Sequence, residues 1–494
     1  MPEKPPEAAG KGGGWPSGPA LPQNPDSEIG AGARPPDAPK SADDAASTSS
    51  AASPALTREE IAHREVGRTN VAPGVALLLA SLFLVSIYGV PCLQHLDDAS
   101  EYVRGGRSSW VPQCYSILGV LAESADAFRQ ADGGPITRVV TANRRLLRGL
   151  RRYEDALQDS SWLSRELLPP TQGVLSRWFR VGNEKVYVGR KGWLFYRPDV
   201  EYVTGPGFLS RRHARSRTQA AREWDSVPRH DPVGAIAGFN DQMKARGIRL
   251  IVMPTPVKPS IHPEKLSRAY RASGDAVENP SFDDFLKRLR ARGIEVFDCA
   301  GLLAGQHGRT GQPQYLAGDT HWRPEAMDGV ASALAFVIER RASLSPAALA
   351  RYRREPVRLS SVGDLRAMLK EPESRRAELE PVQIKQVLSA DHELWRADRG
   401  AEVLVLGDSF SNIYSLPAMG WGEAAGFVEQ LSFHLQRPVD RVVQNDNGAY
   451  ATREALLREC AANPGRLKGT RVVVWQFASR ELAFGDWQAA PFGP

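Results

Sequence analysis

An uncharged run of 26 residues, from Thr69 to Gln94, constrains this chain more than any other feature of its sequence. As a helix, the run would be about 39 Å long at about 1.5 Å per residue, against a bilayer hydrocarbon core of about 30 Å. It therefore predicts a single transmembrane helix over residues 71–93. A buried core helix is the alternative, and a cleaved signal peptide fits less well because a long tail precedes the run.

The charges on the two sides of this run predict its orientation. Several arginines lie just before it, within residues 57–70, whereas Asp97, Asp98 and Glu101 follow it. Since positive residues favour the cytoplasmic side, we expect the N-terminus in the cytoplasm and the chain after about residue 95 in the periplasm. The protein would then cross the cell inner membrane once.

The chain before this run differs in composition from the rest. Its first 54 residues hold 11 of the 37 prolines, together with Gly, Ala, Ser and Asp, and almost nothing that a core would bury. Such a composition is typical of disorder. We expect a disordered cytoplasmic tail over residues 1–56 and a charged juxtamembrane segment over residues 57–70.

Two regions with different patterns follow the apolar run. Residues 94–184 alternate apolar and charged residues at helical spacing, which predicts one or two amphipathic helices that form a spacer or a flanking layer. From Lys185 to Tyr196, β-rich runs on both sides of a Gly-Arg-Lys-Gly turn predict a hairpin.

The remainder alternates helices with short apolar strands. The strand candidates are IRLIVMPTP, IEVFDCAG, AEVLVLGDSF, VDRVVQND and RVVVWQFAS. Continuous apolar strands of this kind belong to a parallel sheet that is covered on both faces. We therefore expect residues 185–494 to form a three-layer α/β/α domain, with functional groups at the carboxyl ends of its strands.

A serine directly follows one of these strands, in the order Gly407, Asp408, Ser409. A sharp turn there would place the hydroxyl at the edge of the sheet beside backbone N–H groups, which suits a nucleophile and an oxyanion hole. Asp and Ser also form ordinary turns and helix N-caps, so the tripeptide alone does not establish a nucleophile.

A carboxylate and an imidazole occur together in the segment YLAGDTHWRPEAM, where Asp319 lies two residues before His321. In an extended segment the two side chains point the same way. The carboxylate can then orient the imidazole, which takes a proton from a hydroxyl in a Ser-His-Asp relay. A surface turn before a helix that starts near Pro324 is the alternative, and other pairs such as His230 with Asp231 occur.

Together, GDTHW and GDSFS resemble the alginate O-acetyltransferases of the AlgX and AlgJ type, whose domains look like permuted SGNH hydrolases. Asp and His precede Ser here, as in that family, whereas the serine comes first in ordinary SGNH esterases. The segments VYVGRKGWLFYRPDVEYVTGP, VMPTPVKPSIHPEKL, SSVGDLRAML and VVVWQFASREL also resemble the family, over about residues 150–485. Little sequence follows, so we expect no carbohydrate-binding module of the AlgX type and a chain nearer to the membrane-anchored AlgJ type.

The resemblance implies a role for each matching residue. Ser409 would be the nucleophile, His321 the general base and Asp319 the residue that orients the base. It also implies that a membrane-bound O-acyltransferase delivers acetyl to the serine, which passes it to a hydroxyl of a nascent exopolysaccharide.

Other residues are candidates for the oxyanion hole and the substrate groove. Asn445 and Asn447, in the segment QNDNG, are candidates for a second oxyanion donor, with simple turn formation as the alternative. Aromatic residues at strand ends more often belong to the core. The candidates for the groove are Lys258, Tyr414, Trp475 and Arg480.

No cofactor, metal or nucleic-acid partner is expected. The chain has no Walker loop and no G-x-G-x-x-G, and its 9 histidines and 4 cysteines do not have the spacing of a structural zinc site. Cys114, Cys299 and Cys460 would lie in an oxidising compartment, which permits one disulfide, although their spacing does not identify the pair.

Two other functions are compatible with the same sequence. An SGNH-type carbohydrate esterase would use water in place of the sugar, and a non-catalytic polysaccharide-assembly protein would leave the triad unused. The net charge of +6 slightly favours an anionic polymer. The insertion over residues 343–399 either contacts the acceptor or covers the sheet.

Overall fold

The computed structural model describes residues 72–106, 112–220, 229–271, 274–346, 350–373 and 379–490. The predicted tail over residues 1–56 and the charged segment over 57–70 lie outside these ranges. The chain divides into two compact units, residues 1–77 and 78–494, and almost all described residues belong to the second.

One long helix opens the described part of the chain. It consists of α2 (Pro73–Leu84), a π-helical turn η1 (Val85–Gly89) and α3 (Val90–Val103). Its length and composition are sufficient to cross a membrane. The helix continues beyond the apolar run because its polar residues have partners: the Gln94 side chain accepts a hydrogen bond from the backbone of Trp162 at 2.7 Å, and Arg165 pairs with Glu101 at 2.7 Å.

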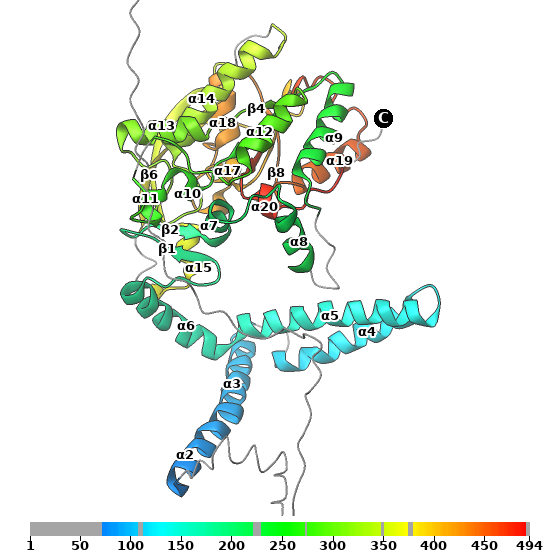
Figure 1. Cartoon of the computed structure of the whole chain (residues 1–494), viewed down its shortest axis with the longest axis vertical. Coiled ribbons are helices and arrows are strands. Elements are labelled where there is room, and N and C mark those ends of the chain that lie inside the picture. The colour runs from blue at the N-terminus through cyan, green and yellow to red at the C-terminus, as the bar shows by residue number, and fades with distance from the viewer. Residues whose placement is uncertain are drawn as a thin grey trace, which may run out of the picture. The chain divides into compact units, whose positions relative to one another are not determined.

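The region after this helix is helical, as predicted, but its described residues form three α-helices where the sequence predicted one or two. Its elements are η2 (Gln113–Ser116), α4 (Ile117–Gln130), α5 (Pro135–Ser160), α6 (Trp162–Val174) and η3 (Leu175–Phe179). Helices α4 and α5 lie side by side as a hairpin (Figure 1). Gly149 permits their close approach, because a Cβ at this position would lie 2.4 Å from the side chain of Val120.

A short antiparallel hairpin marks the start of the α/β part. It pairs β1 (Val186–Val188) with β2 (Leu194–Tyr196), which confirms the predicted hairpin. Its turn contains Lys191 and Gly192 in the left-handed region, with φ of 54° and 79°, as tight hairpin turns require. Two helices follow: α7 (Arg197–Thr204) and α8 (Arg211–Ala220).

The central sheet has five strands, all parallel. They are β3 (Arg249–Thr255), β4 (Glu295–Val296), β7 (Val403–Gly407), β8 (Asp440–Val443) and β9 (Val472–Ala478). Each corresponds to one of the five predicted runs. Their order is β4-β3-β9-β7-β8, so β9, the last in sequence, pairs with both β3 and β7. The carboxyl ends of these three strands therefore meet at one edge of the sheet.

Helices cover both faces of this sheet (Figure 1). One face packs against α9 (Pro232–Ala245), α12 (Phe282–Ala291) and α19 (Ala451–Ala462), and the other against α13 (Ala300–Thr310), α14 (Pro324–Arg341) and α18 (Phe427–Leu435). Neighbouring residues of one strand enter opposite cores: Leu404 and Leu406 face the first set of helices, and Val405 faces the second. The predicted three-layer α/β/α architecture is confirmed.

The insertion between α14 and β7 carries its own small sheet. It pairs β5 (Arg353–Ser361) with β6 (Glu380–Leu388) in antiparallel fashion, and α15 (Asp364–Leu369) lies between them in sequence. The other short elements are α10 (Lys258–Ile261), α11 (Pro263–Leu266), α17 (Ser409–Asn412), η4 (Pro417–Met419) and α20 (Glu481–Phe484). All four cysteines are free, so the disulfide that the sequence permits is not formed.

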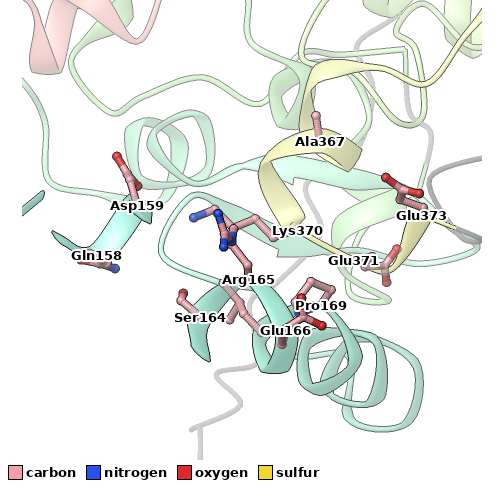
Figure 2. A pocket seen from close by; sticks show the side chains of 11 residues that line it. Gln158, Asp159, Ser164, Arg165, Glu166, Pro169, Ala367, Lys370, Glu371 and Glu373 are labelled. Carbon is pink, nitrogen blue, oxygen red and sulfur yellow. The ribbon is translucent and has the colours of Figure 1, made fainter. Parts of the chain in front are cut away.

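Helix α6 and the turn after it lie against the insertion. The hydroxyl of Ser176 donates a hydrogen bond to the carboxylate of Glu371, in a buried position. Beside this contact is a pocket of about 810 Å³, and Figure 2 shows Arg165 of α6 and Lys370 from the end of α15 among the side chains that line it. These contacts join the helical region to the α/β domain.

Candidate active site

The turn after β7 presents Ser409 in the predicted manner. Gly407 ends the strand, and Ser409 is the first residue of α17. Position 407 requires glycine, because a Cβ would lie 2.4 Å from the hydroxyl of Ser411. Ser409 is 8% exposed, so its side chain lies at the edge of the sheet with little access to bulk water.

Asp408 holds this turn against the neighbouring strand. Its carboxylate accepts the backbone N–H of Phe410 at 2.9 Å and that of Ala478 at 2.7 Å. Gln476 of β9 accepts the backbone N–H of Asp408 at 3.0 Å and donates its amide to the carboxylate at 2.8 Å. The position of Ser409 is thus fixed from two strands.

Asp319 and His321 form the predicted hydrogen-bonded pair. Asp319 Oδ1 lies 2.7 Å from His321 Nδ1 and also accepts the backbone N–H of His321 at 3.0 Å. Its Oδ2 accepts the indole N–H of Trp421 at 2.9 Å and the backbone N–H of Asp364 at 3.0 Å. Each of the two carboxylate oxygens of Asp319 therefore accepts two hydrogen bonds, and these four bonds favour the ionised form of the carboxylate.

The same segment packs directly against the Ser409 turn. The rings of His321 and Phe410 meet edge to face with centroids 4.8 Å apart, and the Trp322 indole donates to the carbonyl of Phe410 at 3.1 Å. The Tyr414 hydroxyl donates to the carbonyl of Trp322 at 2.7 Å. Since Phe410 is the neighbour of Ser409, these contacts place the His321 ring against the turn that holds Ser409.

The shifted pKa values of Asp319 and His321 suit different roles: Asp319 stays ionised, and His321 accepts a proton more readily. Burial opposes the charged form of His321, but the hydrogen bond with Asp319 and the charges of Asp319 and Asp364 outweigh it and raise the pKa of His321 above 6.5. Burial also opposes the charged form of Asp319, but its hydrogen bonds outweigh this and hold its pKa well below the usual range. His321 Nε2 is buried and has no hydrogen-bond partner among the described residues, so it is free to accept a proton.

Three of the predicted groove residues are core residues instead. Lys258, Tyr414 and Trp475 have no exposed surface, so they do not line an open groove. Lys258 donates to the carbonyls of Leu194 and Ala317, which ties the β1–β2 hairpin to the segment before Asp319. Burial lowers the pKa of Lys258 to about 8, against the opposing charges of nearby carboxylates.

Arg480, the fourth groove candidate, lies close to the Ser409 turn. Its guanidinium pairs with buried Asp199 at 3.0 Å and lies 5.9 Å from the ring centroid of Phe410. Its side chain is 15% exposed. Arg480 therefore places a fixed positive charge beside the candidate site.

The two asparagines after β8 differ in their surroundings. The Asn445 side chain accepts a hydrogen bond from Asn412, on the helix that Ser409 begins, at 2.9 Å. Asn447 has φ of 54°, and its carbonyl accepts the backbone N–H groups of Tyr450 and Ala451, as in a turn that starts a helix. Asn445 thus lies near the candidate nucleophile, whereas Asn447 has the contacts of the turn-forming alternative.

Sequence reasoning did not identify Asp364 and Trp421 as parts of this site. Both contact the carboxylate of Asp319, and Asp364 Oδ2 lies 3.9 Å from His321 Nδ1. Burial and the negative charge of Asp319 raise the pKa of Asp364 to about 6. The one available signal was that Asp364 lies within SSVGDLRAML, a segment that resembles the family.

Two clusters of described residues could hold a metal ion by the proximity of their ligand atoms: Asp319, His321 and Asp364, and His262, Glu264 and His307. In the first, His321 Nδ1 hydrogen-bonds to Asp319. In the second, the contacts of Glu264 with the histidines measure 3.5 and 3.4 Å, but His262 Nε2 accepts the backbone N–H of Gln314. This bond places the proton of neutral His262 on Nδ1, the nitrogen that a metal would need. In each cluster, one histidine nitrogen that would face the metal, His321 Nδ1 or His262 Nδ1, therefore carries a proton instead.

A family model described as SGNH hydrolase-like domain, acetyltransferase AlgX, matches residues 186–479. The chain belongs to this family. The matched range contains the whole central sheet, the Asp319–His321 pair and Ser409. The family resemblance inferred from GDTHW and GDSFS is confirmed, and so is the SGNH-like fold class.

Two curated relatives are both described as "Probable alginate O-acetylase AlgJ". The protein from Pseudomonas aeruginosa is 29% identical over 156 residues, which cover 32% of this chain and 34% of the relative. The protein from Pseudomonas fluorescens is 33% identical over 104 residues, which cover 21% of this chain and 25% of the relative. The chain therefore spans about a third or less of the length of these AlgJ proteins.

Two solved structures from the same family are also similar. The O-acetyltransferase domain of Pseudomonas putida AlgJ has a TM-score of 0.45 and 20% identity, over 61% of this chain and 93% of that domain. Pseudomonas aeruginosa AlgX has a TM-score of 0.42 and 16% identity, over 60% of this chain and 65% of that protein. These similarities are weak, and the family assignment rests on the family model.

Proposed function

We propose that this family member is a membrane-anchored periplasmic O-acetyltransferase that carries acetyl on Ser409 and passes it to a hydroxyl of an alginate-like exopolysaccharide. One observation carries the proposal: the hydrogen-bonded Asp319–His321 pair packs against the turn that holds Ser409. Covalent catalysis needs a nucleophile, a base beside it and a group that orients the base. These three side chains supply those roles.

In the first half-reaction, Asp319 holds a proton on His321 Nδ1, so that the Nε2 lone pair takes the proton of the Ser409 hydroxyl. The serine oxygen bonds to the carbonyl carbon of the acetyl donor. The tetrahedral intermediate then loses the donor's leaving group, which receives the proton from His321. The products are acetyl-Ser409 and the deacetylated donor.

In the second half-reaction, a sugar hydroxyl attacks the acetyl-serine. His321 Nε2 takes the proton of the sugar hydroxyl, a new ester bond forms, and the bond between Ser409 and the acetyl group breaks. His321 returns the proton to Ser409. The backbone N–H of Ser409 and, as the candidate second donor, Asn445 stabilise the negative oxygen of both intermediates.

Membrane anchoring and the acetyl donor belong to the same proposal. The helix over residues 73–103 has the length and composition of a membrane span, and the arginines that precede its apolar part in the sequence favour a cytoplasmic N-terminus and a periplasmic catalytic domain. The acetyl donor would be a membrane-bound O-acyltransferase in the same bilayer. Residues 185–494 would be the catalytic unit, and residues 94–184 the link between it and the membrane.

The test uses the full chain with an activated acetyl ester and uronate oligosaccharides, followed by mass spectrometry. We expect acetyl on Ser409 and on the sugar. Acetyl-Ser409 that releases only acetate, with a range of acceptors present, would favour the esterase. A chain that never acquires acetyl on Ser409 would contradict the acyl-enzyme proposal and favour the assembly function.

Replacing Asp364 by Asn should move the pH profile of transfer to lower pH. His321 must be neutral to act as a base, so activity rises as pH passes through its raised pKa. Removing the negative charge 3.9 Å from Nδ1 destabilises the imidazolium and lowers that pKa. We expect the acid limb of kcat/KM to shift by about half to one pH unit, measured with the activated ester.

Asn at position 364 keeps an oxygen that can accept the backbone N–H of Thr320, which Asp364 Oδ1 accepts at 2.8 Å. The control is Asp364→Glu, which keeps the charge and should leave the acid limb near its original pH. A purely structural role for Asp364 would instead lower kcat/KM at every pH without moving the limb.

A further inference from the structure

The α4–α5 hairpin carries exposed apolar residues that the acetyltransferase chemistry does not use. On α4, Leu118, Leu121 and Phe128 are 63%, 49% and 41% exposed. Successive residues of a helix are rotated by about 100° around its axis, so these three side chains lie within about 80° of one another around α4. Val120 and Ser124, which contact α5, lie about 100° away around the same helix.

Helix α5 repeats this arrangement. Ile136, Val139 and Val140 are 81%, 56% and 42% exposed, and they fall within about 100° of one another. Two residues of α5 mark the side that packs against α4: Gly149 lies beside Val120, and the carbonyl of Ala142 accepts the hydroxyl of Ser124. Viewed down the helix axis, the exposed stripe of α5 is displaced from these contact residues by about 120°, in the same rotational sense as on α4.

These displacements place both stripes on one side of the hairpin. Two antiparallel helices are related by a two-fold rotation perpendicular to the plane that contains them, so the same rotational displacement points to the same side of that plane. The opposite side is polar, since Glu123 of α4 pairs there with Arg145 and Arg152 of α5. The six apolar residues therefore form one exposed surface, which we call the hairpin face.

The base of the hairpin is attached to α3 where the uncharged run ends. The backbone N–H of Gln113 donates to the carboxylate of Asp98 at 3.1 Å, and the rings of His95 and Tyr115 meet with centroids 5.9 Å apart. Tyr153 of α5 donates to the carbonyl of Cys114 at 2.9 Å. In a membrane-anchored chain, these contacts hold the hairpin at the level where α3 leaves the hydrocarbon core.

We propose that the hairpin face lies on the periplasmic surface of the bilayer that the helix over residues 73–103 crosses. The inference rests on the proposed membrane anchoring and adds a second, peripheral contact with the same membrane. A bilayer surface accommodates an amphipathic helix whose apolar side enters the headgroup region. It also lies beside the base of the hairpin, whereas a separate protein would have to be recruited there.

Arginines at the margins of the hairpin face fit this occupant. By helical position, Arg129 adjoins the stripe of α4, and Arg144 and Arg151 adjoin the stripe of α5. All three are exposed. At a bilayer surface, arginine side chains lie with their carbon stems along the apolar region and their charged ends among the phosphates. The margin therefore matches the chemistry of phospholipid headgroups.

The test reconstitutes the full chain into vesicles of phosphatidylcholine and phosphatidylglycerol. The photoreactive residue p-benzoylphenylalanine replaces Leu121, Phe128 or Val139, one at a time. The matched control is the same replacement at Asp126, which is exposed on the polar side of α4. After illumination, mass spectrometry should detect about tenfold more lipid adduct from the three apolar positions than from position 126.

Other outcomes would overturn the inference. Equal lipid labelling from both sides of α4, or no lipid adduct from the apolar positions, would exclude a seated hairpin face. Adducts with a second copy or with another protein would assign the face to a protein interface. Vesicle flotation and acetyl capture on Ser409 are measured on the same samples: a chain that floats and captures acetyl without lipid adducts refutes only the hairpin inference, whereas a chain that does not float refutes the anchoring as well.

Discussion

Replacing Ser409 by Ala should reduce acetyl transfer by a factor of about 10⁴ to 10⁶, the range seen when the nucleophile of a catalytic triad is removed. The proposed acyl-enzyme cannot form without the serine oxygen, whereas the Asp319–His321 pair and the strand contacts of the turn remain. The measurement is kcat/KM with an activated acetyl ester and an oligosaccharide acceptor. Intact-protein mass spectrometry should show no acetylated enzyme.

Ser411 provides a matched control in the same turn. Its hydroxyl donates to Gln476 at 2.8 Å and is fully buried, so Ser411→Ala removes a structural hydrogen bond worth about 1 kcal/mol. This variant should have a lower melting temperature but should still capture acetyl. If Ser409→Ala folded normally and formed an acetylated enzyme, the nucleophile would have to be another residue.

Replacing Asp319 by Asn should lower kcat by a factor of about 10⁴, since loss of the orienting carboxylate allows the wrong imidazole tautomer. At about 1.4 kcal/mol per factor of ten, this corresponds to about 5.5 kcal/mol. Asn cannot replace the carboxylate here, because each of the two oxygens of Asp319 accepts two hydrogen bonds. Whichever way the amide turns, its NH₂ group meets two donors.

The effect of Asp319→Asn on folding must be separated from its effect on chemistry. Thermal unfolding reports the cost of the mismatched donors, and kcat of the folded fraction reports the catalytic loss. The neighbouring change Asp364→Asn serves as the comparison, because it also removes one carboxylate and should cost far less in kcat. Equal losses for the two variants would contradict the orienting role of Asp319.

Sequence patterns were sufficient where local chemistry determines structure. The five strands were recognisable because each lies in a segment with a short apolar run bounded by turn residues. The Asp319–His321 pair was recognisable because two residues in one extended segment need no tertiary information to meet. The order of the strands was not predicted, since β9 enters the centre of the sheet from the end of the chain.

Long-range contacts explain what the patterns missed. Asp364 begins the short helix α15 and Trp421 lies in a loop, and their importance becomes visible only when the Asp364 backbone and the Trp421 indole are seen to hydrogen-bond to Asp319. Lys258 and Tyr414 were candidates for a groove, yet both are buried and hydrogen-bonded to backbone carbonyls. The hairpin face was hidden because its two stripes combine only after α4 and α5 pair.

The insertion between α14 and β7 contributes directly to the surroundings of the Asp319 carboxylate, through the backbone N–H of Asp364. Exchanging the insertion between homologues would therefore also change the contacts of Asp319, even if the aim were only to change the polymer that is used. A transplanted insertion must reproduce the start of α15 beside Asp319, or the recipient will lose turnover before any change in acceptor preference becomes measurable.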